Sequence, residues 1–153
     1  MGNLGGSASI EIKAPLQEVW AVLEDVMSSP EWQGGLDAMT ALEHDSDGRP
    51  VLVETESDIK VRRLKAHMRF RFEGPTRLAW TQERGDLKSV EGAWTLEDLG
   101  GGRTRATYTL HADPGRVLGL VIRGPVEAAT RAIFVAGRPG ELKRRLEASA
   151  AAR

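Results

Sequence analysis

The chain has 153 residues, of which 41% are hydrophobic and 28% are charged, and its formal net charge is −1. These values fit a single globular domain with one core, and they exclude a collagen-like, coiled-coil or disordered chain. Basic and acidic residues are interleaved, as in ETESDIKVRRLK (54–65), so nothing in the overall charge indicates binding to nucleic acid or to an anionic membrane.

A strand and a helix are predicted first. Ile10 and Ile12 alternate with polar residues in SIEIKAP (9–15), which predicts a half-buried strand. Pro15 stops this strand and suits the first turn of a helix. Apolar residues then recur at the spacing of an amphipathic helix. They are Leu16, Val19, Trp20, Leu23 and Val26.

The stretch SSPEWQGGL (28–36) predicts a second short helix. One of its two serines caps the helix, Pro30 occupies the first turn, and the helix ends at Gly34 and Gly35. This arrangement places Trp32 over the gap between the first helix and the sheet. We therefore expect Trp32 to line the mouth of a cavity.

From residue 38 the apolar pattern changes to period two, which predicts a series of strands. The candidate strands are 38–44, 51–61, 63–73, 77–84, 88–97 and 104–112. Short turns join them, with Asp47 and Gly48 in one turn and Gly74 and Pro75 in another. Consecutive strands joined in this way form an antiparallel meander, because parallel strands need longer crossovers.

The apolar side of these strands predicts which residues face the interior. The inner face carries aromatic, sulfur-containing and polar side chains: Thr55, Ser57, Met68, Phe70, Trp80, Gln82, Trp94 and Tyr108. The opposite side sends His67, Arg69 and Arg71 to solvent, which leaves no interior His, Lys or Arg on these strands and argues against acid–base catalysis. A bulge at Gly92 would bring Glu91 inward, although a solvent-facing Glu91 is the commoner arrangement.

Helical periodicity returns from Pro114 to about Glu147. One side of this region is apolar and contains several small residues: Leu118, Val121, Ile122, Ala129, Ala132, Ile133 and Ala136. Alanines that face a curved sheet leave unfilled volume, which is how small-molecule sites are commonly built. The alternative is a solid, close-packed core. The motif GRPG (137–140) predicts a kink or a short break in the helix.

Several kinds of site have no support in the sequence. Cysteine is absent, and the three histidines lie on separate predicted strands, so we expect neither a metal site nor a cofactor. No apolar run approaches the length of a membrane span, and the N-terminus lacks the features of a secretory signal. We expect a cytoplasmic domain over residues 8–147, with residues 1–7 and 148–153 as flexible termini.

Five stretches together resemble the SRPBCC superfamily, also described as START-like or birch-pollen-allergen-like, in its bacterial polyketide cyclase/dehydrase-like branch. They are APLQEVWAVLEDVMSSPEW (14–32), FEGPTRLAWT (72–81), GDLKSVEGAWTLED (85–98), TRATYTLHADPG (104–115) and ELKRRLE (141–147). The resemblance implies an α+β helix-grip fold. In this fold a curved antiparallel sheet of about seven strands wraps around a long C-terminal helix, and two short helices follow the first strand.

The resemblance also implies an internal cavity for a hydrophobic small molecule that is lipid-like, isoprenoid or polyketide-like. The candidate ligand-binding residues are Trp32, Ala129, Ile133 and the eight inner-face residues given above. A polyketide aromatase/cyclase or dehydratase is the first alternative, with Tyr108 or Glu91 as the acid or base. A protein-interaction module of the ribosome-associated or toxin–antitoxin type is the second. We expect a monomer or homodimer without stable membrane insertion.

Overall fold

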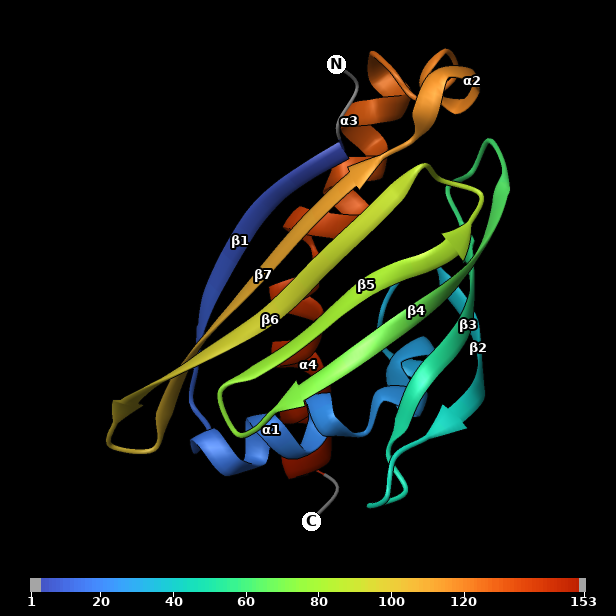
Figure 1. Cartoon of the computed structure of the whole chain (residues 1–153). Helices are drawn as coiled ribbons and strands as arrows, with labels where there is room; N and C mark the ends of the chain where they lie inside the picture. The colour runs from blue at the N-terminus through green and yellow to red at the C-terminus, as the bar shows by residue number, and fades with distance from the viewer. Residues whose placement is uncertain (1–3, 152–153) are drawn as a thin grey trace.

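The computed structural model describes residues 4–151, in which one curved antiparallel sheet wraps around a long helix (Figure 1). The order of strands in the sheet is β1-β7-β6-β5-β4-β3-β2. The strands are β1 (Leu4–Ile12), β2 (Leu36–His44), β3 (Pro50–Asp58), β4 (Arg63–Glu73), β5 (Arg77–Gly85), β6 (Ser89–Gly100) and β7 (Arg103–Asp113). The predicted antiparallel meander is confirmed, with β1 added at one edge beside β7.

The helices lie in two groups along the chain. Two short ones follow β1, namely α1 (Leu16–Glu24) and the 3₁₀ helix η1 (Val26–Glu31). The others follow β7: α2 (Gly115–Gly119), α3 (Pro125–Arg131), the π-helix η2 (Ala132–Ala136) and α4 (Arg138–Ala151). Figure 1 shows that α3, η2 and α4 form one long helix that crosses the concave side of the sheet. This is the α+β helix-grip fold.

The ends of the structured region extend beyond the predicted limits. Strand β1 begins at Leu4, and its first residues pair with β7, as in Leu4 opposite Ala112. At the other end, α4 continues to Ala151. Residues 4–7 and 148–151, which were expected to be flexible, are therefore in regular structure, while residues 1–3 and 152–153 lie outside the described part of the chain.

The second short helix begins and ends earlier in the sequence than predicted. It begins at Val26, so both serines of SSPEW lie inside it and neither caps it. The Ser28 hydroxyl instead donates to the Asp25 carbonyl at 2.8 Å. Pro30 lies in the last turn of the helix rather than in its first, and Trp32 follows directly after the helix ends.

The interior contains two apolar clusters rather than one continuous core. The first lies where α1, α4 and the sheet meet, and its most buried members include Val19, Val26, Val53, Trp94 and Leu142. The second lies toward α2 and consists of Leu4, Ile59, Leu64, Val90, Ala112, Leu118 and Ile122. The space between these two clusters is the site described below.

The motif GRPG (137–140) does not break the C-terminal helix. A π turn precedes it, in which the Gly137 amide donates to the Ala132 carbonyl at 2.9 Å, five residues back. Pro139 has no amide hydrogen to donate, and in a regular α-helix its ring would clash with the carbonyl four residues earlier. The wider π turn accommodates Pro139, so the predicted break is replaced by a change in the phase of the helix.

The inward face of this helix differs from the predicted one. Thr130, Val135, Arg138, Leu142 and Leu146 are buried, whereas Ala129, Ala132 and Ala136 are exposed. The alanine stripe is therefore a solvent face, and the prediction of an alanine-lined cavity was wrong. The physical reason is that apolar alanine carries little burial energy, so it marks the inner face of a helix weakly.

The sheet is regular at Gly92, and no bulge reverses its faces there. Gly92 pairs with Trp80 on one side and with Leu110 on the other, in continuous register. A Cβ atom at Gly92 would lie 2.5 Å from Cζ2 of Trp80, so the glycine allows the indole to lie flat over β6. Glu91 is consequently exposed on the outer face.

Candidate ligand cavity

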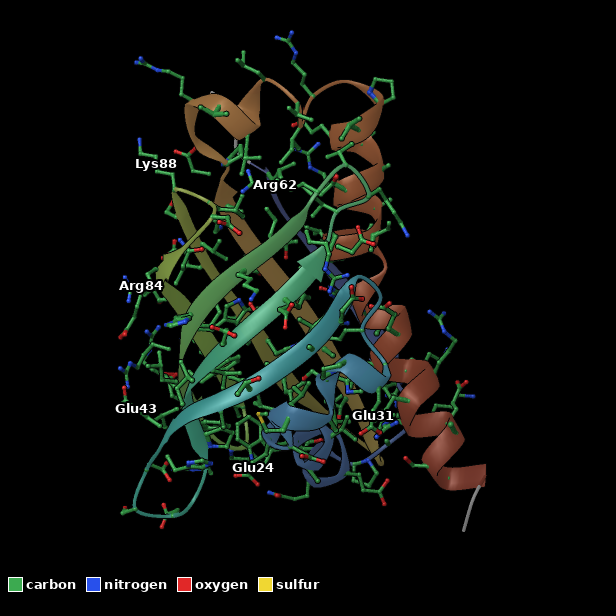
Figure 2. The ribbon with its side chains drawn as sticks, turned by 90° about the vertical axis from the view of Figure 1, so that its right-hand side faces the viewer. Glu24, Glu31, Glu43, Arg62, Arg84 and Lys88 are labelled. Atoms are coloured by element: carbon green, nitrogen blue, oxygen red, sulfur yellow. The ribbon has the colours of Figure 1, made fainter. Side chains whose placement is uncertain are left out.

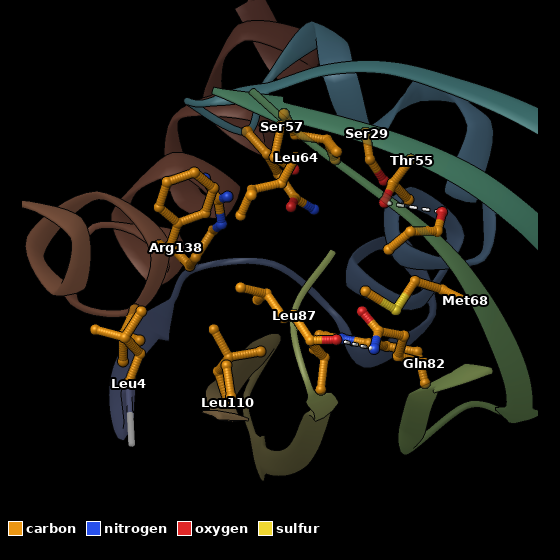
Figure 3. A pocket seen from close by; sticks show the side chains of 18 of the residues that line it. Leu4, Ser29, Thr55, Ser57, Leu64, Met68, Gln82, Leu87, Leu110 and Arg138 are labelled. Atoms are coloured by element: carbon orange, nitrogen blue, oxygen red, sulfur yellow. Dashed lines mark hydrogen bonds between the residues drawn. The ribbon is translucent and has the colours of Figure 1, made fainter. Parts of the chain in front are cut away.

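A cavity of about 160 Å³ lies between the concave face of the sheet and the long helix (Figure 3). Residues of both apolar clusters form its walls, and Met68 and Leu110 pack against both clusters. Most of the lining is aliphatic or aromatic, including Leu4, Leu64, Met68, Phe70, Leu78 and Leu110. The curvature of the sheet and the phase of the helix together create this space, so the interior is not a solid core.

Aromatic rings in mutual contact form one wall of the cavity. The centroids of Trp80 and Tyr108 are 5.6 Å apart, and those of Phe70 and Trp80 are 5.9 Å apart. Trp94 meets Tyr108 edge-on at 4.8 Å. Rings at these separations and angles interact favourably and restrict one another's rotation. The rings are tilted by 37° to 63° to one another, so this wall is a rigid apolar surface of interlocking rings.

Eight of the predicted ligand-binding residues line the cavity: Thr55, Ser57, Met68, Phe70, Trp80, Gln82, Trp94 and Tyr108. All eight come from the alternation pattern of the strands. Ala129 and Ile133 instead line a second pocket, between α3 and the loop that joins β3 to β4. The helix contribution was therefore predicted on the wrong side of the helix.

Trp32 does not line the cavity. It packs against the first apolar cluster, with its ring 6.2 Å from that of Trp94. Its Nε1 atom is buried and has no hydrogen-bond partner among the described residues. Trp32 covers the back of the aromatic wall, so it acts as a core residue rather than as a residue at the cavity mouth.

Two of the predicted polar groups hydrogen-bond to the backbone of the sheet. The Thr55 hydroxyl donates to the Ala66 carbonyl at 3.4 Å, and the Gln82 amide donates to the Leu87 carbonyl at 2.9 Å. Their donors are thereby engaged in holding strands and turns together. They make the lining less polar than their side chains alone suggest.

Arg138 is a cavity residue that sequence reasoning missed. It lines the cavity and is only 2% exposed. Its Nη1 donates to the Gly34 carbonyl at 2.7 Å and to Oε1 of Glu141 at 2.8 Å. Oε2 of Glu141 accepts a hydrogen bond from the Gly34 amide at 2.7 Å. The ion pair thus ties the helix to the loop that precedes β2.

The glycines of the QGG motif allow this close approach. Gly35 has a φ of +79°, and a Cβ atom there would lie 2.5 Å from Cζ of Phe134. The Phe134 ring in turn lies 5.0 Å from the Arg138 guanidinium, which is within range for a cation–π contact. The sequence signal for this arrangement was weak, since a glutamate three residues after an arginine also describes many exposed pairs.

Arg138 and Tyr108 supply the polar character of the cavity. The Nε atom of Arg138 is buried and makes no hydrogen bond to any described residue. Burial raises the pKa of the Tyr108 phenol above its usual value, and the positive charge of nearby Arg138 opposes only part of that rise. Tyr108 is therefore a neutral hydrogen-bond donor at physiological pH.

No group of three His, Asp or Glu side chains within residues 4–151 is arranged to hold a metal ion. No helix in the part of the chain that the structure describes is both long and apolar enough to cross a bilayer. The chemistry available in the cavity is therefore that of Arg138, Tyr108 and a few hydroxyl and amide groups.

A family model described as polyketide cyclase / dehydrase and lipid transport matches residues 6–147. The chain belongs to this family. No curated protein matches the chain significantly. The family assignment agrees with the sheet, helix and cavity described above, and it covers every described cavity residue except Leu4.

Solved structures with the same fold include members of the START superfamily and polyketide aromatase/cyclases. A START superfamily protein from Mycobacterium smegmatis is 16% identical, with a TM-score of 0.80 and coverage of 95% of this chain and 98% of that one. The Zhui aromatase/cyclase from Streptomyces sp. R1128 is 16% identical, with a TM-score of 0.76 and coverage of 97% and 96%. At these identities the likeness establishes the fold.

A third structure shows the same fold as part of a larger chain. The di-domain aromatase/cyclase StfQ of the steffimycin biosynthetic pathway is 15% identical, with a TM-score of 0.62. The match covers 93% of this chain and 46% of that one. The polyketide cyclase / dehydrase and lipid transport family member described here thus corresponds to about one half of that di-domain protein.

Proposed function

We propose that this protein binds or carries a hydrophobic small molecule in the cavity between the sheet and the long helix. The observation that carries this proposal is the cavity itself, an interior space of about 160 Å³ with a mostly apolar lining. Native interiors are normally close-packed, so a retained apolar space of this kind is costly unless something occupies it. The family description and the START superfamily neighbour support the same conclusion.

The lining also narrows the class of ligand. A rigid wall of aromatic rings favours a ligand with rings or a branched chain, such as a polyketide-like, isoprenoid or lipid-like molecule. Arg138 and Tyr108 place hydrogen-bond donors beside the apolar walls, where a ligand oxygen can accept from them. Glu141 neutralises Arg138, so the pair favours an uncharged acceptor such as a ketone over a carboxylate.

A fluorescence titration tests the proposal with the neutral apolar dye N-phenylnaphthylamine. Ser57→Phe adds a ring to a half-buried position in the lining, so we expect it to weaken dye binding by about tenfold or more. The matched control is Ser89→Phe, at an exposed position on β6, which should leave affinity unchanged. Absence of dye binding to the unmodified protein, or equal binding to both variants, would contradict the proposal.

A polyketide aromatase/cyclase or dehydratase is the second candidate, because an ionisable pair and a phenol lie at the cavity. As an enol carbon of the substrate bonds to a ketone carbon and the ketone π bond breaks, neutral Tyr108 can donate its proton to the ketone oxygen, and the proton released by the enol hydroxyl restores the phenol. Glu91 is exposed on the outer face of the sheet and cannot reach such a substrate. Zhui and StfQ, which share this fold, are described as aromatase/cyclases.

Tyr108→Phe separates this second candidate from simple binding. If the protein is a cyclase, the variant should lose at least about a hundredfold in the rate at which a linear poly-β-ketone becomes an aromatic product, because the proton donor is gone. Dye affinity should be almost unchanged, since the ring is kept. Product formation is measured by absorbance. An equal rate for the variant would remove Tyr108 as the acid.

A further inference from the structure

A short amphipathic segment projects at one end of the molecule, at Arg116–Arg123 (RVLGLVIR). It contains most of α2 and the turns that follow, and Gly115 and Gly124, with φ of 82° and 60°, bracket it. Figure 1 shows α2 at the end of the sheet opposite α1 and the C-terminus. We call this stretch the apical segment.

The apical segment exposes aliphatic side chains on one face. Val117, Leu120 and Val121 are 75%, 64% and 48% exposed, and their spacing places them on the same side of a helical turn. Leu118 and Ile122 point the other way and are buried in the second apolar cluster. The inner residues thus anchor the segment, so the exposure of the outer three belongs to its folded conformation.

Positive charge accompanies these aliphatic residues. Arg116 and Arg123 stand at the two ends of the segment, and the structure shows no ion pair between either of them and a described residue. Lys88 and Arg62 lie toward the same end of the molecule, whereas Glu24 and Glu31 lie at the opposite end (Figure 2). Arg62 and Lys88 are paired with Asp86 and Asp113 at 3.8 Å, so the unpaired positive charge at this end of the described chain belongs to Arg116 and Arg123.

We propose that the apical segment docks reversibly on the surface of an anionic phospholipid bilayer. Aliphatic side chains at a projecting tip can enter the acyl region while the flanking guanidinium groups contact lipid phosphates. A protein partner fits less well, because interface cores are broad and rich in aromatic residues, and this tip is narrow and purely aliphatic. The proposal goes beyond ligand binding and does not depend on it.

The apical segment lies next to the ligand cavity. Ile122 belongs to the apical segment and also lines the cavity. The second pocket, which Val61, Pro125 and Val126 help to line, lies beside the same end of the long helix. An apolar molecule dissolved in a bilayer would therefore meet the protein next to a wall of the cavity.

Co-sedimentation with vesicles tests the docking surface. The protein should bind vesicles of phosphatidylcholine mixed with phosphatidylglycerol at low salt, and should bind pure phosphatidylcholine vesicles about tenfold more weakly. Leu120→Asp places a charge among the exposed aliphatic residues and should remove most of the binding. Arg116→Ser combined with Arg123→Ser should weaken binding to the anionic vesicles by about tenfold.

The matched control is Leu42→Asp, because Leu42 is 44% exposed but lies on β2, away from the apical segment. It should bind the anionic vesicles as the unmodified protein does, and all variants should keep the same melting temperature. The proposal is overturned if the anionic vesicles are not bound, if Leu42→Asp and Leu120→Asp weaken binding equally, or if neutral vesicles are bound equally well.

Discussion

Glu141→Leu is expected to lower the free energy of unfolding by about 3–5 kcal/mol, because it leaves Arg138 buried without its counter-ion. Arg138 donates to Oε1 of Glu141 at 2.8 Å and is almost completely buried. The variant also removes the acceptor for the Gly34 amide, which Oε2 of Glu141 supplies at 2.7 Å. Chemical denaturation monitored by circular dichroism measures the change.

The same helix supplies a matched control. Arg145 donates to Glu31 at 2.9 Å in an ion pair at the surface, so Glu31→Leu should cost less than about 1 kcal/mol. Replacing both buried partners, Arg138→Met with Glu141→Leu, should recover much of the lost stability because no uncompensated charge remains. Equal losses for Glu141→Leu and Glu31→Leu would show that burial of the pair is energetically unimportant.

The second large effect concerns ligand selection by the Arg138 side chain. The unmodified protein should bind α-tetralone about tenfold more tightly than tetralin, because the two share a ring system and α-tetralone adds one hydrogen-bond acceptor. The double variant Arg138→Met, Glu141→Leu should lose most of this preference, because only the Tyr108 hydroxyl then remains as a donor. Isothermal titration calorimetry measures both affinities, and the double variant avoids the instability expected of a single change.

A surface ion pair provides the control, because its removal shows whether loss of any ion pair from this helix changes the preference for the ketone. The variant Arg145→Met, Glu31→Leu removes an ion pair of the same type from the outside of the helix, so it should keep the preference for the ketone. Equal affinities in the unmodified protein would contradict the role of Arg138 while leaving apolar binding intact. Failure to bind either molecule would instead count against the proposed function.

The sheet was predictable because alternation along a strand reports directly on burial. The eight predicted lining residues from β3 to β7 all border the cavity, from Thr55 to Tyr108. Strands β5, β6 and β7 pair in continuous register around Gly92, so the faces assigned from the apolar residues hold there. Burial on one face of a sheet is thus encoded residue by residue.

The helix side of the cavity was less predictable, for two physical reasons. Alanine contributes little burial energy, so Ala129, Ala132 and Ala136 marked the wrong face. The π turn then shifts the phase of the residues after it, which periodic analysis at a constant spacing does not detect. Arg138 was missed because its burial depends on Glu141 and on the backbone of Gly34, which approaches from a distant part of the chain.

The π turn at Ala132–Ala136 has a consequence for how this site can change during evolution. Removing one residue from that turn would convert it to an ordinary α turn and rotate everything after it by about 100° around the helix axis. Arg138 would leave the cavity although no residue of the lining had been substituted. A single-codon deletion would therefore replace a cavity that contains the Arg138 guanidinium with one that lacks it, so indels in this turn are a route to new ligand specificity.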